Sequence, residues 1–156
     1  MVDIAEIITP ERVVLNLRSC SSKRQVLKEL AGRAASAVGV DEQRLLEALL
    51  ERERLGTTGI GHGIAIPHAR LGELDHLVGL FARLDQPVDF EALDDRPSDL
   101  IFLLLAPNSA DADSLKALAR ISRVLRDPAL QQRLRQEKDR QTVYRLLTQK
   151  SESHAA

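Results

Sequence analysis

The run Gly56–Arg70 reads GTTGIGHGIAIPHAR and holds four of the eight glycines in this 156-residue chain. Glycine adopts backbone conformations that other residues avoid, and it lets a ligand approach the main chain closely. The amides and threonine hydroxyls of such a run are suited to cradle an anion. Ile66 precedes Pro67 and is therefore biased toward extended structure, with His68 next in the chain. The run predicts a glycine-rich turn that leads into an extended segment carrying a histidine.

Short apolar runs on both sides of this segment predict strands, because they are rich in branched residues and bounded by turn formers. The expected extended segments are Arg12–Leu17, Ile64–Leu71, Leu77–Leu84 and Leu100–Leu105. The stretch Asp85–Asp99 is rich in Asp and Pro, and it predicts an irregular connection between the last two strands.

Apolar residues at three- and four-residue spacing predict amphipathic helices, and polar N-caps or a glycine stop mark their ends. The first expected helix starts at Ser21 or Ser22 and stops at Gly39, and the second starts at Asp41 and ends near Arg54. The third starts at Asp113, the fourth starts at Asp127 with Pro128 in its first turn, and the last runs from Asp139 to Leu147. The expected apolar stripe of the third helix is Leu115, Leu118, Ala119, Ser122 and Leu125.

Helices that flank strands throughout the chain predict an α/β fold, a single-domain sandwich of a small mixed sheet flanked by helices. A length of 156 residues fits one domain, since domains average about 150 residues. The expected domain covers residues 1–150, and the polar sequence SESHAA at 151–156 is expected to be a tail.

The composition argues against several classes of function. The 22 Lys and Arg residues are balanced by 23 Asp and Glu residues, which disfavours a nucleic-acid-binding surface. Aromatic residues make up 3% of the chain, too few for base-stacking platforms. No basic leader or long apolar run is present, so we expect a cytoplasmic protein without membrane insertion.

The residues around His68 favour phosphoryl chemistry. An imidazole is largely neutral near pH 7, so a ring nitrogen can attack phosphorus without a separate base. Arg52 and Arg70 flank the glycine run with planar cationic groups suited to phosphate oxygens. The same pattern also fits an ordinary glycine turn followed by a surface histidine.

The sequence disfavours nucleotide binding at the glycine run. A Walker loop requires Lys and then Ser or Thr after its second glycine, where this chain has His62 and Gly63. A dinucleotide-binding loop that starts at Gly59 would require glycine at the position of Ile64.

The runs RERLGTTGIG (52–61) and GIAIPH (63–68) resemble the signature of the fructose/mannitol-type enzyme IIA domains of the phosphotransferase system (PTS). The run DFEALDDRP (89–97) and the strand that ends at Ala106 and Pro107 match the same family. The resemblance covers nearly the whole chain. As a single domain without a transporter or a cysteine-bearing IIB partner, the chain is most similar to the nitrogen-regulatory members.

The resemblance implies roles for individual residues. His68 would accept a phosphoryl group from a histidine of an HPr-like carrier, and Arg52 would steady that group, without a cofactor or metal. Thr57, Thr58, Gly59 and Gly61 would form the adjacent phosphate-binding loop. The family usually has a second histidine where this chain has Ser114, and a hydroxyl can donate one hydrogen bond but cannot become cationic.

The resemblance further implies a histidine phosphocarrier and regulator, a component of phosphotransfer rather than a stand-alone catalyst. Its phosphorylated and free forms would bind different target proteins, which in this family include potassium transporters and sensor kinases. Two alternatives remain open: a sugar-uptake enzyme IIA that donates phosphate to a IIB cysteine, and a binding module for anions without covalent chemistry.

Two further features are weaker candidates. His62, Asp75 and His76 could contribute to a metal site, but zinc ligands usually show tighter spacing in the sequence. Cys20 has no companion thiol, which disfavours a redox role and excludes an intrachain disulfide.

Overall fold

The fold is described from a computed structural model that covers residues 3–18 and 20–149. The elements in chain order are two short 3-10 turns (Ile4–Glu6 and Pro10–Arg12), β1 (Val13–Leu17), α1 (Lys23–Val38), α2 (Glu42–Arg54), β2 (Gly59–Gly61), β3 (Ile64–Ala65), β4 (His68–Arg70), β5 (Val78–Val88), β6 (Ser98–Ala106), α3 (Asp111–Leu125), α4 (Pro128–Gln136) and α5 (Arg140–Thr148). The predicted tail at 151–156 lies outside the described residues.

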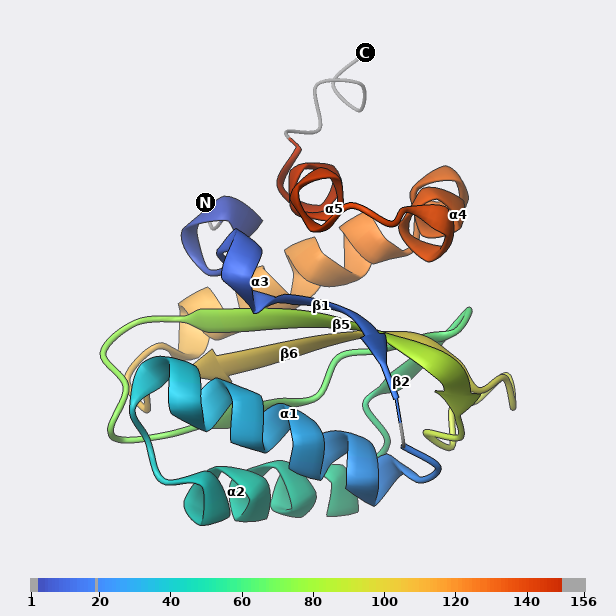
Figure 1. Cartoon of the computed structure of the whole chain (residues 1–156). Coiled ribbons are helices and arrows are strands. Elements are labelled where there is room, and N and C mark those ends of the chain that lie inside the picture. Colours follow the sequence, from blue (N-terminus) through green and yellow to red (C-terminus); the bar gives the residue numbers. More distant parts are fainter. Residues whose placement is uncertain (1–2, 19, 150–156) are drawn as a thin grey trace.

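A six-stranded mixed sheet separates two layers of helices (Figure 1). Its strand order is β1-β5-β6-β3-β2, and β4 also pairs with β6. Strands β5 and β6 are antiparallel, whereas β3 and β4 run parallel to β6. Helices α1 and α2 lie on one side of the sheet, and α3, α4 and α5 lie on the other. This arrangement confirms the predicted α/β sandwich.

The two central strands supply both hydrophobic cores, because successive side chains of a strand point to opposite faces. Leu80 and Leu103 pack into the core beneath α1 and α2. Phe81 and Phe102 pack into the core beneath α3, α4 and α5. Burial on both faces explains why the sequence of β6 is a nearly continuous apolar run.

The predicted caps set the helix ends. Ser22 rather than Ser21 is the N-cap of α1, with its side chain accepting a hydrogen bond from the amide of Gln25. Gly39 ends α1 in the left-handed region at φ 75°. The predicted caps Asp41 and Asp127 likewise accept backbone hydrogen bonds at the starts of α2 and α4. Asp139, predicted as the first residue of the last helix, is the N-cap of α5 and accepts a hydrogen bond from the amide of Thr142.

The predicted strand boundaries were wrong in two places. Strand β5 continues to Val88 and pairs there with Ser98, so only the middle of the expected Asp85–Asp99 connection is irregular. Residues 85–87 are exposed, and polar residues are compatible with this end of the strand. The expected Ile64–Leu71 segment contains two short strands, β3 and β4, separated at Pro67, which has no amide proton to donate.

The start and the buried face of α3 also differ from the prediction. The helix begins at Asp111 rather than Asp113. Its buried residues are Ser114, Ala117, Ile121 and Leu125. The predicted stripe is rotated by about one residue, because Leu115 is 66% exposed and does not enter the core. The leucine pattern therefore gave the correct element with an incorrect inner face.

No helix within residues 3–18 and 20–149 has both the length and the apolar character needed to cross a membrane.

The close approach of β5 and β6 at Gly79 predicts a stability effect. A Cβ at this position would lie 2.9 Å from Cε1 of Phe102, a side chain that is fully buried and has little room to move. We expect Gly79→Ala to lower the free energy of unfolding by about 1–3 kcal/mol in urea denaturation, because the added methyl overpacks the core.

Gly32→Ala is the matched control for this substitution. Gly32 lies within α1, and a Cβ there would make ordinary contact with the Glu42 carboxylate at 3.5 Å. We expect it to raise the free energy of unfolding by about 1 kcal/mol, because alanine is the better helix former. Equal stability of Gly79→Ala and the unmodified protein would contradict the packing described at β5 and β6.

Candidate functional site

Three elements bring three of the predicted site residues together. His68 opens β4, which pairs in parallel with β6, so the carboxyl ends of both strands meet at one edge of the sheet. Helix α3 begins at Asp111, shortly after β6 ends, and α2 packs beside β4. Arg52 in the last turn of α2 and Ser114 in the first turns of α3 therefore lie near His68.

The hydrogen bonds of His68 define the tautomer of its ring. Nδ1 lies 2.9 Å from the carbonyl oxygen of Ile66, and Nε2 lies 3.1 Å from Nε of Arg52. A carbonyl oxygen only accepts hydrogen bonds and a guanidinium nitrogen only donates them. Nδ1 therefore carries the proton, and Nε2 presents a lone pair toward Arg52. Nε2 is therefore the ring nitrogen whose lone pair is available to an electrophile.

The surroundings of His68 favour its neutral form. Burial lowers the pKa of His68 below its ordinary value of 6.5, and the positive charges of Arg52 and Arg70 lower it further. The hydrogen bond to Ile66 and the negative charge of Glu53 act in the opposite direction without reversing the shift. The imidazole is therefore unprotonated at Nε2 near neutral pH, as a nucleophile requires.

His68 lines a cavity of about 480 Å³ that also contains Arg52, Arg70 and Ser114. Most of its remaining wall is apolar, and Leu55 and Leu115 contribute exposed side chains to it. The cavity thus combines an imidazole that has an unprotonated nitrogen with two cations and a largely apolar wall.

Of two polar residues beside His68, Ser114 has an unpaired hydroxyl among the described residues, whereas Arg70 is engaged in an ion pair. Ser114 is 7% exposed, and its hydroxyl has no hydrogen-bond partner among the described residues. Arg70 forms an ion pair with Asp111 at the start of α3, with Nη1 2.5 Å from Oδ1. A buried hydroxyl without a partner costs free energy, so Ser114 is available to an added acceptor.

The predicted phosphate-binding loop makes its contacts within the protein. The hydroxyl of Thr57 donates to the carbonyl of Phe90 and accepts a hydrogen bond from the amide of Gly59 at 2.9 Å. Thr58 donates both its amide and its hydroxyl to Glu53. Thr57, Thr58 and Gly59 do not appear among the residues that line the cavity of His68, so their role as phosphate ligands stays a prediction.

Gly61, the remaining residue of the predicted loop, has a structural constraint of its own. Its φ is 93°, and a Cβ there would lie 3.1 Å from Oδ2 of Asp94. It is also absent from the lining of the His68 cavity, and its assignment as a phosphate ligand stays a prediction.

Glu53 is a residue that the sequence argument missed. It follows Leu45 and Leu49 on the same face of α2 at four-residue spacing, and it is buried with them. Its carboxylate accepts hydrogen bonds from Thr58 and Lys23. A charged residue on an apolar stripe was the signal that would have identified it.

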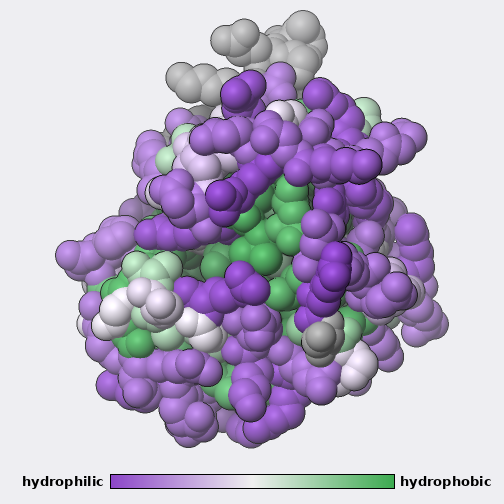
Figure 2. Space-filling view, in the orientation of Figure 1, coloured by the Kyte–Doolittle hydropathy of each residue, from purple (hydrophilic) through white to green (hydrophobic). Residues whose placement is uncertain are grey.

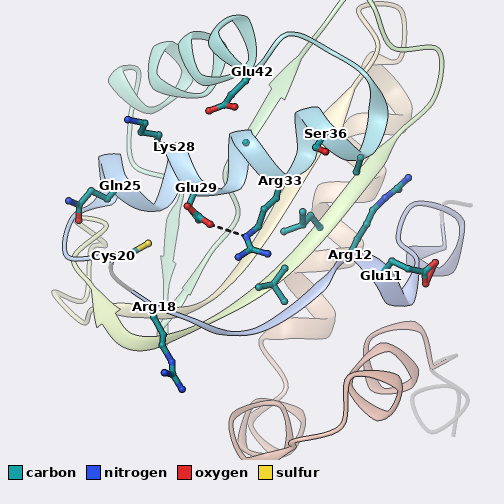
Figure 3. A pocket seen from close by; sticks show the side chains of 14 residues that line it. Glu11, Arg12, Arg18, Cys20, Gln25, Lys28, Glu29, Arg33, Ser36 and Glu42 are labelled. Atoms are coloured by element: carbon teal, nitrogen blue, oxygen red, sulfur yellow. Dashed lines mark hydrogen bonds and ion pairs between the residues drawn. The ribbon is translucent and has the colours of Figure 1, made fainter.

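A larger cleft of about 770 Å³ lies between β1 and α1, away from His68 (Figure 3). In the orientation of Figure 1, Figure 2 shows hydrophobic residues in a central hollow surrounded by hydrophilic ones. Glu29 and Arg33 in the cleft form an ion pair at 3.1 Å. Burial, followed by the charge of Glu29, raises the pKa of the Cys20 thiol, which makes this cysteine a weak nucleophile.

The alternative metal residues do not converge. His62 lies in the turn between β2 and β3, where its amide donates to Asp94. Nδ1 of His76 lies 2.5 Å from Oδ1 of its neighbour Asp75. Across residues 3–18 and 20–149, no group of three or more His, Cys, Asp or Glu side chains is arranged to hold a metal ion.

Comparison with known families identifies the class of protein. The sequence model of the family described as phosphoenolpyruvate-dependent sugar phosphotransferase system, EIIA 2, matches residues 6–150. The chain belongs to this family, which confirms the resemblance drawn from its motifs.

Within the family, similar proteins include nitrogen regulatory proteins. A nitrogen regulatory protein of Bradyrhizobium diazoefficiens is 51% identical over 144 residues, which cover 92% of this chain and 94% of the relative. One from Pseudomonas aeruginosa is 38% identical, with 94% and 96% covered. The crystal structure of nitrogen regulatory protein IIA-Ntr from Neisseria meningitidis matches with a TM-score of 0.88 and 31% identity, covering 93% of this chain and 99% of that chain.

The environment of His68 predicts its titration. We expect its NMR titration midpoint to lie below 6.5, and we expect Arg52→Ala to raise it, because the substitution removes a positive charge and exposes the ring. Arg54→Ala is the control, since this exposed arginine of the same helix pairs with Glu51. A midpoint that Arg52→Ala leaves unchanged would exclude the contact described at Nε2.

The same shift has a consequence for stability. Between the folded pKa of His68 and 6.5, the unfolded chain binds more protons than the folded chain. The contribution of the neutral imidazole is therefore fully present above pH 6.5 and is lost as the pH falls through this window. We expect acid unfolding of His68→Gln to show a weaker pH dependence in this window than that of the unmodified protein.

Proposed function

We propose that this chain is a histidine phosphocarrier and regulator, in which Nε2 of His68 accepts a phosphoryl group from an HPr-like carrier. The observation that carries the proposal is the unprotonated Nε2, placed 3.1 Å from a guanidinium nitrogen of Arg52 in an accessible cavity. Membership of the EIIA 2 family and similarity to nitrogen regulatory proteins support it.

The transfer step follows from the tautomer of the ring. The lone pair of Nε2 forms a bond to phosphorus, while the bond from phosphorus to the donor imidazole breaks and its electron pair returns to the donor nitrogen. The proton on Nδ1 stays in its hydrogen bond to Ile66. Arg52 releases Nε2 and donates to the phosphoryl oxygens, where its charge offsets theirs.

Ser114 supplies a second donor in this proposal. Its buried hydroxyl has no other hydrogen-bond partner among the described residues and lines the same cavity as His68. It would donate one hydrogen bond to a phosphoryl oxygen, in the place where the family usually has a histidine. Because a hydroxyl remains neutral, it adds no positive charge to the site.

Exposed apolar side chains at the rim of the cavity favour a protein as the partner that delivers the phosphoryl group. Leu55 is 81% exposed and Leu115 is 66% exposed, and both line the cavity of His68. Large apolar side chains exposed beside a reactive group are typical of a docking surface for another protein. They favour delivery of the phosphoryl group by a carrier over uptake of a free anion.

Regulation would act through the charge added at this rim. Phosphorylation brings about two negative charges to a spot where apolar and cationic side chains lie together. A partner that docks on the apolar rim would be repelled, and a partner with a basic surface would be attracted. Potassium transporters and sensor kinases are the proposed kinds of target, in the cytoplasm as expected from the sequence.

Loss of the acceptor gives a direct test. The purified protein is mixed with phosphoenolpyruvate, the first PTS enzyme and an HPr-like carrier, and its intact mass is recorded. We expect the mass of one phosphoryl group to be added, to disappear on brief acid treatment, and to be absent in His68→Ala.

His62→Ala and His76→Ala are the controls for this test, because neither residue lines the cavity of His68. They should be phosphorylated like the unmodified protein. Phosphate retained by His68→Ala, or lost in either control, would place the acceptor elsewhere.

The role of Ser114 predicts a change in rate. A hydrogen bond to a charged group contributes about 1.5–3 kcal/mol, so Ser114→Ala should slow phosphoryl transfer about tenfold or more. Ser114→His should accelerate it, since a protonated imidazole also offsets negative charge. Rapid-quench kinetics would measure both rates, and unchanged transfer in both variants would remove Ser114 from the mechanism.

A further inference from the structure

Glu53 is a buried carboxylate that does not line the cavity of His68. It is 9% exposed and stands on the apolar face of α2, one residue after Arg52. Neighbouring residues of a helix point in different directions, so Arg52 faces His68 while Glu53 faces the loop that follows the helix. A buried charge costs free energy unless it is paired and hydrogen-bonded, so its partners indicate what it holds.

The carboxylate is held by donors from two parts of the chain. Its Oε1 accepts from the hydroxyl of Thr58 at 2.6 Å, and its Oε2 accepts from the amide of Thr58 at 2.9 Å. Nζ of Lys23 lies 3.3 Å from Oε2 and also 2.6 Å from Oε1 of Glu91. Burial opposes the charge of Lys23, but its hydrogen bonds to these two carboxylates raise its pKa overall.

A continuous series of hydrogen bonds runs from Glu53 to the imidazole. Thr58 is fixed to Glu53 by two donors, and its carbonyl accepts from the amide of Ile66 at 2.9 Å. The carbonyl of Ile66 in turn accepts from Nδ1 of His68 at 2.9 Å. The orientation of the acceptor for Nδ1 thus depends on the position of Thr58, and Thr58 is positioned by Glu53.

We propose that Glu53 is a positioning residue that acts through Thr58 and Ile66 to hold His68 as the Nδ1–H tautomer, with the Nε2 lone pair toward Arg52. The importance of this tautomer for phosphoryl transfer rests on the proposed function, but the tautomer itself is a property of the unphosphorylated protein.

The charge of Glu53 fits the state that follows transfer. When Nε2 carries the phosphoryl group and Nδ1 keeps its proton, the ring is formally cationic. Arg52, Arg70 and Glu53 are charged neighbours that shift the pKa of His68, and Glu53 is the negatively charged one of the three. Its negative charge and the carbonyl of Ile66 offset the positive ring, whereas the two arginines offset the phosphoryl oxygens.

The tautomer is measured directly by the ¹⁵N shifts of His68 in the unphosphorylated protein, assigned with His68→Ala. We expect a protonated Nδ1 and an unprotonated Nε2 in the unmodified protein. In Glu53→Ala, we expect a mixture of tautomers, faster hydrogen exchange at the Ile66 amide, and phosphoryl transfer about tenfold slower or more. Glu53→Gln keeps the side-chain shape and should shift the tautomer in the same direction by a smaller amount.

Glu47→Ala is the control, because Glu47 is an exposed carboxylate of the same helix. It should leave the tautomer and the transfer rate unchanged. If Glu53→Ala fails to fold, the ¹⁵N shifts of His68 in Glu53→Gln test the proposal instead. A folded variant with the unmodified tautomer and rate would overturn the proposal. A shifted tautomer in a protein whose unmodified form accepts no phosphate would instead refute the proposed function and leave the positioning role intact.

Discussion

The hydrogen bond from Nδ1 of His68 to the carbonyl of Ile66 joins the side chain of the proposed phosphoryl acceptor to the backbone that leads into its own strand. Because it occupies the protonated nitrogen, it leaves the other nitrogen with a lone pair directed at Arg52. The surrounding fold keeps this geometry: β4 is paired with the largely buried central strand β6, and the amide of Ile66 donates to the carbonyl of Thr58 in the glycine-rich loop. The chemistry is therefore set by backbone placement as much as by the histidine itself.

Much of the fold was predictable because its signals are local. Caps such as Asp41 and Gly39 fix helix ends through hydrogen bonds to residues three or four positions away in the chain, and the apolar run of β6 reflects burial on both faces. The wrong predictions concern strand ends and helix faces that are determined by packing between residues far apart in the sequence. The exposed residues 85–87 continue strand β5, which shifts register after Arg83 and pairs with β6 again at Val88 and Ser98. Helix α3 turns Leu115 outward and Ser114 inward, a choice that leucine spacing alone did not reveal.

The site was predictable to the extent that a family motif carries it. Arg52 and His68 belong to the same stretch of family motif in the sequence, and the structure brings their side chains into contact. Ser114 is distant in the sequence and reaches the same cavity through the register of β4 on β6 and the start of α3. Glu53 was missed because its contacts come from a loop that folds back onto the end of α2, which the sequence of the helix does not reveal. Local patterns identify reactive groups more readily than the groups that orient them.

The serine in the first turns of α3 has a consequence for the lifetime of the phosphorylated protein. A pocket with two imidazoles responds to acidity through two coupled protonation events. Among the described residues that line this cavity, His68 is the one histidine, and the hydroxyl beside it keeps its proton throughout the physiological range. Hydrolysis of the phosphorylated form should therefore depend on protonation of the phosphohistidine itself, without a contribution from a second imidazole in the cavity.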